Sequence, residues 1–162
     1  MDESALDFDF EDISEDTQEG KYLTFFIDKC VYAIEIKYVT EIIGIQPITE
    51  MPEVANYIKG IINLRGKIIP VMDVRLRFNK EIAEYDDRTC IIVVEVNDIS
   101  LGLIVDNVSE VIQISDESIV VPPELNKGTE NKYIKSIGKV GNSVNLILSC
   151  EILISDEVES LI

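Results

Sequence analysis

Short apolar runs separated by turn residues follow one another from residue 21 to residue 149. Residues 22–27 are rich in aromatic and β-branched side chains, and Tyr32, Ile34 and Ile36 share one face of the next run. This period of two predicts β-strands at 22–27 and 31–36. The same pattern predicts further strands at 41–46, 59–64, 67–73, 89–97, 99–105, 108–114, 134–140 and 143–149. About ten short, evenly spaced strands indicate a mainly β fold built as small barrels or a sandwich.

Turn residues and helical signals refine this picture at a few positions. Asp28-Lys29-Cys30 predicts a tight hairpin turn between the first two strands. Pro70 predicts that its strand lies at a sheet edge or carries a bulge, because proline cannot donate to a ladder. No capping box begins at Ser155, yet the apolar spacing of residues 151–162 still favours a helix. Helical segments are therefore expected to be short and to lie at 37–40, 74–78 and 151–162.

The chain also repeats part of its own pattern. The positions Ile34, Ile36, Val39, Glu41 and Ile42 recur at identical spacing as Leu103, Val105, Val108, Glu110 and Val111. A second match aligns Tyr57-Ile58-Lys59-Gly60-Ile61 with Tyr133-Ile134-Lys135-Ser136-Ile137, and each copy precedes a glycine turn. Such repeats predict two equivalent subdomains, although apolar strand patterns can also match by coincidence. Because each half is too small for a large core, the halves should pack together and leave a groove at their seam.

Charge and composition narrow the classes of partner. The chain has 162 residues, of which 46% are hydrophobic, and a net charge of −17 from 31 acidic and 14 basic residues. Phosphate contacts need clusters of Lys and Arg, so we expect no nucleic-acid binding and no insertion into an anionic membrane. Nine of the acidic residues lie in residues 1–20, which hold no Lys or Arg. We therefore expect a disordered acidic tail at 1–20 and one domain at 21–162, divided near 76–88.

The same features suggest a cytoplasmic protein. The N-terminus is acidic where a secretory signal is basic, and no apolar run approaches the roughly 20 residues that span a bilayer. Cys30, Cys90 and Cys150 lie far apart in apolar runs, and we interpret them as small buried side chains in a reducing compartment.

Catalytic chemistry has little support in the sequence. The chain contains no histidine, which removes the usual general base and the commonest transition-metal ligand. No nucleophile elbow, phosphate-binding loop or dinucleotide-binding glycine pattern is present. We therefore expect no enzyme, no catalytic residue, no metal and no cofactor. A hydrolase that uses only carboxylates and an oligonucleotide-binding barrel are the rival hypotheses, and both are disfavoured.

Arg65 is a charged residue among apolar strands and is a candidate for binding a partner. Arg65 follows the run 59–64 and precedes the run 67–73, and Glu41 is a candidate partner from the preceding strand. If the two pair, the planar guanidinium of Arg65 is held in one direction. Such an arginine beside exposed aliphatic side chains is typical of an interface hot spot. A purely structural ion pair at a barrel end is the equal alternative.

Several motifs carry a family likeness. Asn63-Leu64-Arg65-Gly66 followed by Ile68-Ile69-Pro70-Val71-Met72-Asp73-Val74-Arg75 resembles the central signature of CheW-like domains. The runs Tyr32 to Ile42 and Gly102 to Val111, and Tyr133-Ile134 leading to Gly138, fit the same family. The likeness covers about residues 21–154. Departures from the family pattern occur at Ile43, Ala55 and Ser149-Cys150.

This resemblance implies both a fold and a function. The fold is mainly β, with two interlocked five-stranded SH3-like barrels around a shared core, short helical turns and a short C-terminal helix. The function is that of a non-catalytic cytoplasmic adaptor at membrane receptor arrays. It joins the regulatory domain of a CheA-type histidine kinase to the cytoplasmic tips of methyl-accepting chemoreceptors. An adaptor of another pathway, such as surface motility or other two-component signalling, is the alternative.

The resemblance also suggests binding residues. The candidates for the receptor groove are Val39, Glu41, Arg65, Thr89, Gly102 and Val111. The candidates for the kinase side are Ile42, Ile43, Gly44 and Ile45. A receptor helix would place its apolar face in the groove, with polar contacts fixing its register.

Overall fold

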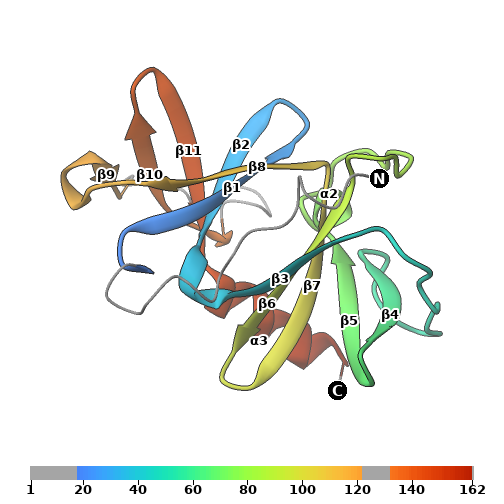
Figure 1. Cartoon of the computed structure of the whole chain (residues 1–162). Helices are drawn as coiled ribbons and strands as arrows, with labels where there is room; N and C mark the ends of the chain where they lie inside the picture. The colour runs from blue at the N-terminus through green and yellow to red at the C-terminus, as the bar shows by residue number, and fades with distance from the viewer. Residues whose placement is uncertain (1–17, 122–131, 162) are drawn as a thin grey trace.

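Two β-sheets form the protein, and each contains strands from both halves of the chain (Figure 1). The structure is a computed structural model that describes residues 18–121 and 132–161. The predicted acidic tail lies outside these residues except for its last three positions. Sheet A has the strand order β8-β1-β2-β11-β10-β9 and sheet B the order β3-β6-β7-β5-β4. A mainly β fold with two subdomains is therefore confirmed.

The strand bounds follow the predicted runs closely. The strands of sheet A are β1 (Lys21–Ile27), β2 (Cys30–Glu35), β8 (Asn107–Gln113), β9 (Ile119–Val120), β10 (Ile134–Val140) and β11 (Ser143–Leu148). The strands of sheet B are β3 (Val39–Gly44), β4 (Ile58–Leu64), β5 (Lys67–Asp73), β6 (Cys90–Val96) and β7 (Ile99–Val105). The outermost strands of each sheet do not pair with each other within the described residues. Both sheets are thus open at their edges, and sheet A has one short strand more than the five of each SH3-like barrel that the resemblance implied.

The strand order confirms the repeat. The hairpin β1–β2 corresponds to β6–β7, and the hairpin β4–β5 corresponds to β10–β11. Strand β3 follows the first hairpin along the chain but pairs with β6, whereas β8 follows the second hairpin and pairs with β1. The third strand of each half, β3 or β8, therefore pairs with a hairpin of the other half, so neither sheet is complete without both halves.

The apolar side chains form one shared core and two smaller ones. The shared core contains residues from both sheets and from the C-terminal helix. Its aromatic rings form a continuous row from Phe25 through Tyr32 and Phe78 to Tyr133, with centroids 5.6–6.0 Å apart. A second cluster lies on the opposite face of sheet B, and a third lies on the opposite face of sheet A. The predicted shared core is thus present.

Short helices follow the last strand of each half. Helix α2 (Val74–Arg77) begins after Asp73, whose carboxylate accepts a hydrogen bond from the Leu76 N–H. Helix α3 (Cys150–Leu161) begins after Ser149, whose hydroxyl accepts from the Ile152 N–H at 3.2 Å. The cap of the C-terminal helix is therefore Ser149, six residues before the serine considered in the sequence. A 3₁₀ turn, η3 (Ile36–Tyr38), and a second, η4 (Asp116–Ser118), complete the elements.

The crossings between the sheets are fixed by polar contacts to these helices. At the β7–β8 crossing, Asp106 accepts two hydrogen bonds of 2.7 Å from Arg75 of α2. At the equivalent β2–β3 crossing, the Tyr38 hydroxyl donates to Glu151 of α3 at 2.6 Å. Each exchanged strand is thus attached to a helix at its origin.

Two further local predictions need correction. Pro70 lies inside sheet B, and the register shift of this hairpin falls between Ile58 and Gly60. The parallel pairing of β5 with β7 begins only at Val71, so Pro70 need not donate to it. Cys30 is exposed at the start of β2, whereas Cys90 and Cys150 are buried as expected.

The described helices are also short in relation to a bilayer. None of them is long and apolar enough to cross a membrane.

Candidate functional site

Arg65 and Glu41 form the pair that the sequence predicted. Arg65 Nη1 donates to Glu41 Oε2 at 2.7 Å, and Nη2 donates to Oε1, so the contact is bidentate. These hydrogen bonds raise the pKa of the Arg65 guanidinium further above its usual range. The arginine side chain is 75% exposed and the glutamate side chain 23% exposed. A fixed guanidinium therefore faces solvent, where it can meet a partner's carboxylate or carbonyl oxygens.

The backbone of the turn between β4 and β5 determines where the Arg65 side chain starts. Arg65 and Gly66 form the two-residue turn between β4 and β5, with φ of 53° and 86°. Such a turn needs positive φ at both central residues, which glycine adopts readily and arginine does not. Asn63 supports the turn, because its Oδ1 accepts a hydrogen bond of 2.9 Å from the Gly66 N–H.

Val39 and Val111 come from the two exchanged strands. Val39 begins β3 and is buried in the shared core, whereas Val111 lies in β8 and is half-buried against the same core. Val111 pairs with Leu23 in sheet A, and Val39 pairs with Val94 in sheet B. The structure therefore places these two candidates on different sheets around one core.

Thr89 lies in a recess at the seam between the sheets. The recess has a volume of about 370 Å³, and its lining includes Phe26 and Asp28 from sheet A together with Arg75. The Thr89 hydroxyl accepts a hydrogen bond of 2.9 Å from the Asp86 N–H. Hydrogen bonds from the backbone N–H groups of Arg88 and Thr89 lower the pKa of the Asp86 carboxyl. Of the six receptor candidates, only Thr89 lines this recess.

Gly102 occupies a different environment from the other candidates. It lies within β7 between the buried side chains Val71 and Ile91. A Cβ at this position would stand 2.7 Å from Val71 Cγ1 and 2.9 Å from Ile91 Cγ2. The glycine therefore permits close packing inside sheet B and offers no side chain to a partner.

The four kinase-side candidates form the end of β3 and the residue after it. Ile42 is 7% exposed and faces the shared core. Ile43 and Ile45 are half-buried against the separate core of sheet B, and Gly44 pairs with Cys90. Of these four residues, only Ile43, Gly44 and Ile45 leave part of their surface open to a partner.

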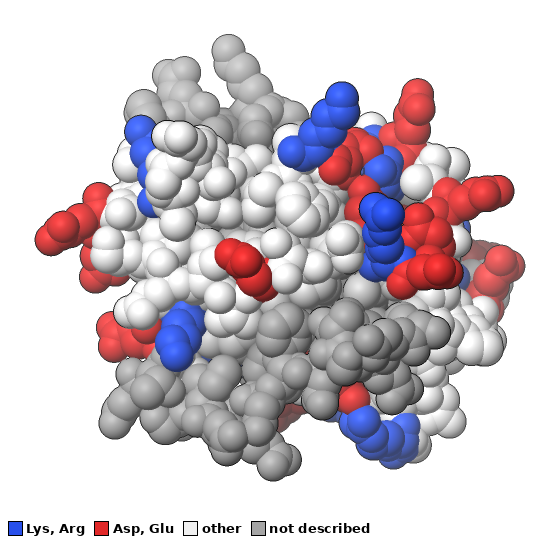
Figure 2. Space-filling view, turned by 45° about the horizontal axis from the view of Figure 1, so that its top comes forward, with Lys and Arg blue, Asp and Glu red and all other residues white. Residues whose placement is uncertain are grey.

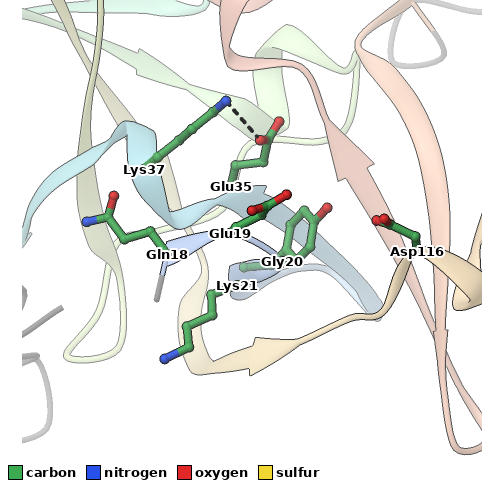
Figure 3. Close-up of a pocket in the computed structure, with 8 residues that line it drawn as sticks. Gln18, Glu19, Gly20, Lys21, Glu35, Lys37 and Asp116 are labelled. Atoms are coloured by element: carbon green, nitrogen blue, oxygen red, sulfur yellow. Dashed lines mark ion pairs between the residues drawn. The ribbon is translucent and has the colours of Figure 1, made fainter. Parts of the chain in front are cut away.

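A larger recess lies away from all these residues. Its volume is about 590 Å³, and it opens beside the start of β1, the end of β2 and η4 (Figure 3). Lys37 pairs with Glu35 at 3.4 Å along one side, and Asp116 lies across from them. Coulombic repulsion from Glu35 and Asp116 adds to burial in raising the pKa of Tyr22. The lining is a mixture of acidic, basic and uncharged polar groups, which makes this a polar surface depression.

Sequence reasoning missed two further groups. The first is a set of exposed apolar side chains near the hairpin ends of both sheets, comprising Ile68, Ile99, Val140 and Val144. The second is a cluster around Arg77 that joins the two halves. Figure 2 shows a face on which charged side chains lie along both sides, most densely on the right, with a largely uncharged area between them. Exposure of this kind cannot be read from a strand pattern, because it depends on which elements cover each face.

The described residues offer no arrangement for metal chemistry. No group of three or more His, Cys, Asp or Glu side chains within residues 18–121 and 132–156 is placed to hold a metal ion. The geometry instead combines a fixed surface arginine, a seam recess and half-buried apolar strands. Such surfaces recognise other proteins.

Comparisons with known proteins agree with the motifs. The family model of the CheW-like domain matches residues 21–158. "Chemotaxis protein CheW" of Klebsiella aerogenes is 31% identical over 91% of this chain and 89% of its own length. The protein of the same name from Bacillus subtilis is 33% identical over 88% of this chain and 92% of its own length.

A solved structure shows the same architecture. The crystal structure of the scaffolding protein TtCheW from Thermoanaerobacter tengcongensis superposes with a TM-score of 0.75 at 36% sequence identity. The match covers 80% of this chain and 88% of that one. The resemblance inferred from the sequence is thus confirmed, and the chain belongs to the family of CheW-like domains.

Proposed function

We propose that this chain is a non-catalytic scaffold that couples chemoreceptors to a CheA-type histidine kinase in chemotaxis signalling. The family and the solved scaffolding relative support this role. The observation that carries the proposal is the strand exchange between the sheets, which makes one rigid body with surfaces from both halves. A scaffold needs such rigidity, because a receptor shift can bias the kinase only if both partners are held in fixed geometry.

The receptor side of the proposal uses the seam and the Arg65 turn. The receptor tip, a helical hairpin, would lie along the seam, where the recess around Thr89 opens between the sheets. Arg65 does not line this recess; held by its bidentate contact with Glu41 at the β4–β5 turn, it would act as a register-setting cation for a part of the receptor outside the recess. Val39 and Val111 would support the groove through the shared core, and Gly102 would act by keeping sheet B closely packed.

The kinase side uses the end of β3. Ile43, Gly44 and Ile45 present half-buried apolar surface, while Ile42 fixes that segment from below in the shared core. The regulatory domain of the kinase has the same fold by family resemblance, so pairing of one β-subdomain against another is the expected mode. This arrangement would place the chain in the cytoplasm, recruited to receptor arrays at the membrane.

Charge reversal at Arg65 tests the receptor side. Arg65→Glu should reduce co-sedimentation with receptor-tip fragments, because it places two carboxylates together at the β4–β5 turn and removes the exposed cation. The double variant Glu41→Arg/Arg65→Glu restores the ion pair in reverse and serves as the matched control. Circular dichroism should be native for both variants. Unchanged co-sedimentation of a natively folded Arg65→Glu protein would refute the assignment.

A further inference from the structure

The two halves meet at one guanidinium. Arg77 of α2 lies between two aromatic rings, with its Cζ 4.5 Å from the ring centroid of Tyr57 and 4.8 Å from that of Tyr133. Arg77 Nη2 donates to the Tyr133 hydroxyl, which donates in turn to Asp156 of α3 at 2.7 Å. Arg77 Nη2 also lies 3.6 Å from Asp156 Oδ2. These four residues are called the Arg77 cluster below.

The cluster joins segments that belong to different sheets. Tyr57 immediately precedes β4 and Arg77 ends the helix after β5, so both are attached to sheet B. Tyr133 immediately precedes β10 of sheet A, and Asp156 lies in α3, which follows β11 along the chain and packs against β6 and β7 of sheet B. A rotation of one sheet against the other would have to separate Tyr133 from Arg77 and Tyr57.

The repeat explains why a single arginine serves both halves. Tyr57 and Tyr133 are equivalent positions, and their carbonyl groups accept equivalent hydrogen bonds from Asp73 N–H at 2.7 Å and Ser149 N–H at 2.8 Å. The residue four after each of these donors is Arg77 in the first half and Leu153 in the second. Arg77 therefore lies between two equivalent rings, while Lys132 is a second cation at the junction, with its Nζ 2.7 Å from Asp156 Oδ2 and 5.7 Å from the Tyr133 ring centroid.

Burial makes the cluster more than a surface ion pair. The side chains of Arg77 and Asp156 are 14% and 18% exposed. Tyr133 is fully buried, and its ring continues the aromatic row of the shared core next to Phe78. Cation–π contacts and charge-assisted hydrogen bonds are stronger when water is excluded in this way.

We propose that Arg77 is a positioning residue that fixes the angle between sheets A and B, and through it the width of the seam to which the proposed function assigns the receptor. Its effect is indirect, because Arg77 does not line the recess around Thr89. The inference about the angle stands without any partner, so its failure can be distinguished from failure of the proposed function.

Spin-label distances test the angle directly. One label goes on native Cys30 of sheet A and the other on an Ile68→Cys substitution in sheet B, both exposed positions. Arg77→Met keeps an unbranched apolar side chain close to the aliphatic part of arginine and removes the guanidinium, so the distance distribution should broaden and shift. Amide exchange in α3 should rise by about tenfold or more, the effect of losing a charge-assisted hydrogen bond. Arg77→Lys should give an intermediate width, because it keeps the charge without the planar stack.

Controls separate positioning from general stability. Lys139→Met removes an exposed cation from β10, and Ile62→Val weakens the separate core of sheet B. Neither should broaden the distribution. If Arg77→Met does not fold, Tyr133→Phe removes only the hydroxyl between Arg77 and Asp156 and should broaden it in part. A folded variant with the wild-type distribution, or equal broadening by Ile62→Val, would overturn the proposal.

Discussion

Replacing Gly102 with alanine tests whether this receptor candidate acts through packing or through contact. The new Cβ would stand 2.7 Å from Val71 Cγ1 and 2.9 Å from Ile91 Cγ2, closer than real Cβ contacts allow. Both neighbours are completely buried, so neither can turn its side chain into solvent. The surrounding strands would have to shift to admit one methyl group.

The expected cost follows from two opposing terms. Overpacking a close-packed core costs about 1–3 kcal/mol. Removing the backbone freedom of a glycine within a strand returns roughly 0.5–1 kcal/mol. Taking the middle of each range, the free energy of unfolding should fall by about 1.3 kcal/mol, which corresponds to a melting temperature about 3–5 °C lower for a chain of this size.

Urea denaturation of a double-mutant cycle measures this effect. Val71→Ala alone should cost about 2 kcal/mol through lost burial and a cavity. In the double variant the new methyl group at position 102 partly fills that cavity and loses its closest neighbour. The two changes should then be less than additive, with a coupling of at least about 0.5 kcal/mol. Additive costs, or a Gly102→Ala protein as stable as the wild type, would refute the packing argument.

Three further predictions rest on other contacts. Tyr85→Phe removes the hydroxyl that donates to the buried Asp73 carboxylate at 2.7 Å, so the free energy of unfolding in urea should fall by about 1–3 kcal/mol; an unchanged midpoint would contradict this. Iodoacetamide at pH 8 should modify Cys30 alone in the folded protein, because burial raises the pKa of the Cys150 thiol to about 12 and also raises that of Cys90. If mass spectrometry finds all three cysteines modified in the folded protein, the burial of Cys90 and Cys150 would be contradicted. Deletion of residues 1–17 should leave kinase binding nearly unchanged, and a large loss measured by calorimetry would instead identify the acidic segment as a docking element.

The elements of this fold could be predicted largely from local pattern. Strands 67–73, 99–105 and 134–140 have the same bounds in sequence and structure, because alternation and turn residues act over a few positions. The exchange of β3 and β8 was implied only by family resemblance. It depends on which hairpin each strand pairs with, and no local pattern specifies that choice. Pro70 illustrates the same limit, since its tolerance inside sheet B depends on where pairing with β7 begins.

The candidate site was predictable in part. The pairing of Glu41 with Arg65 followed from the need of a charge for a partner, and the structure contains it. The burial of Gly102 and Ile42 could not be foreseen, because it depends on the packing of distant strands. The Arg77 cluster was missed for a similar reason. Its aromatic and acidic members come from segments far apart in the chain and meet only after the sheets interlock.

Assembly of three components tests the central claim most directly. A receptor-tip fragment, a CheA regulatory domain and this chain are mixed and separated by size-exclusion chromatography with light scattering. Receptor and kinase fragments should elute together only when the chain is present, in a complex that contains all three. Exclusion of one partner by the other, or binding of neither, would contradict the claim that this two-sheet body holds both at once.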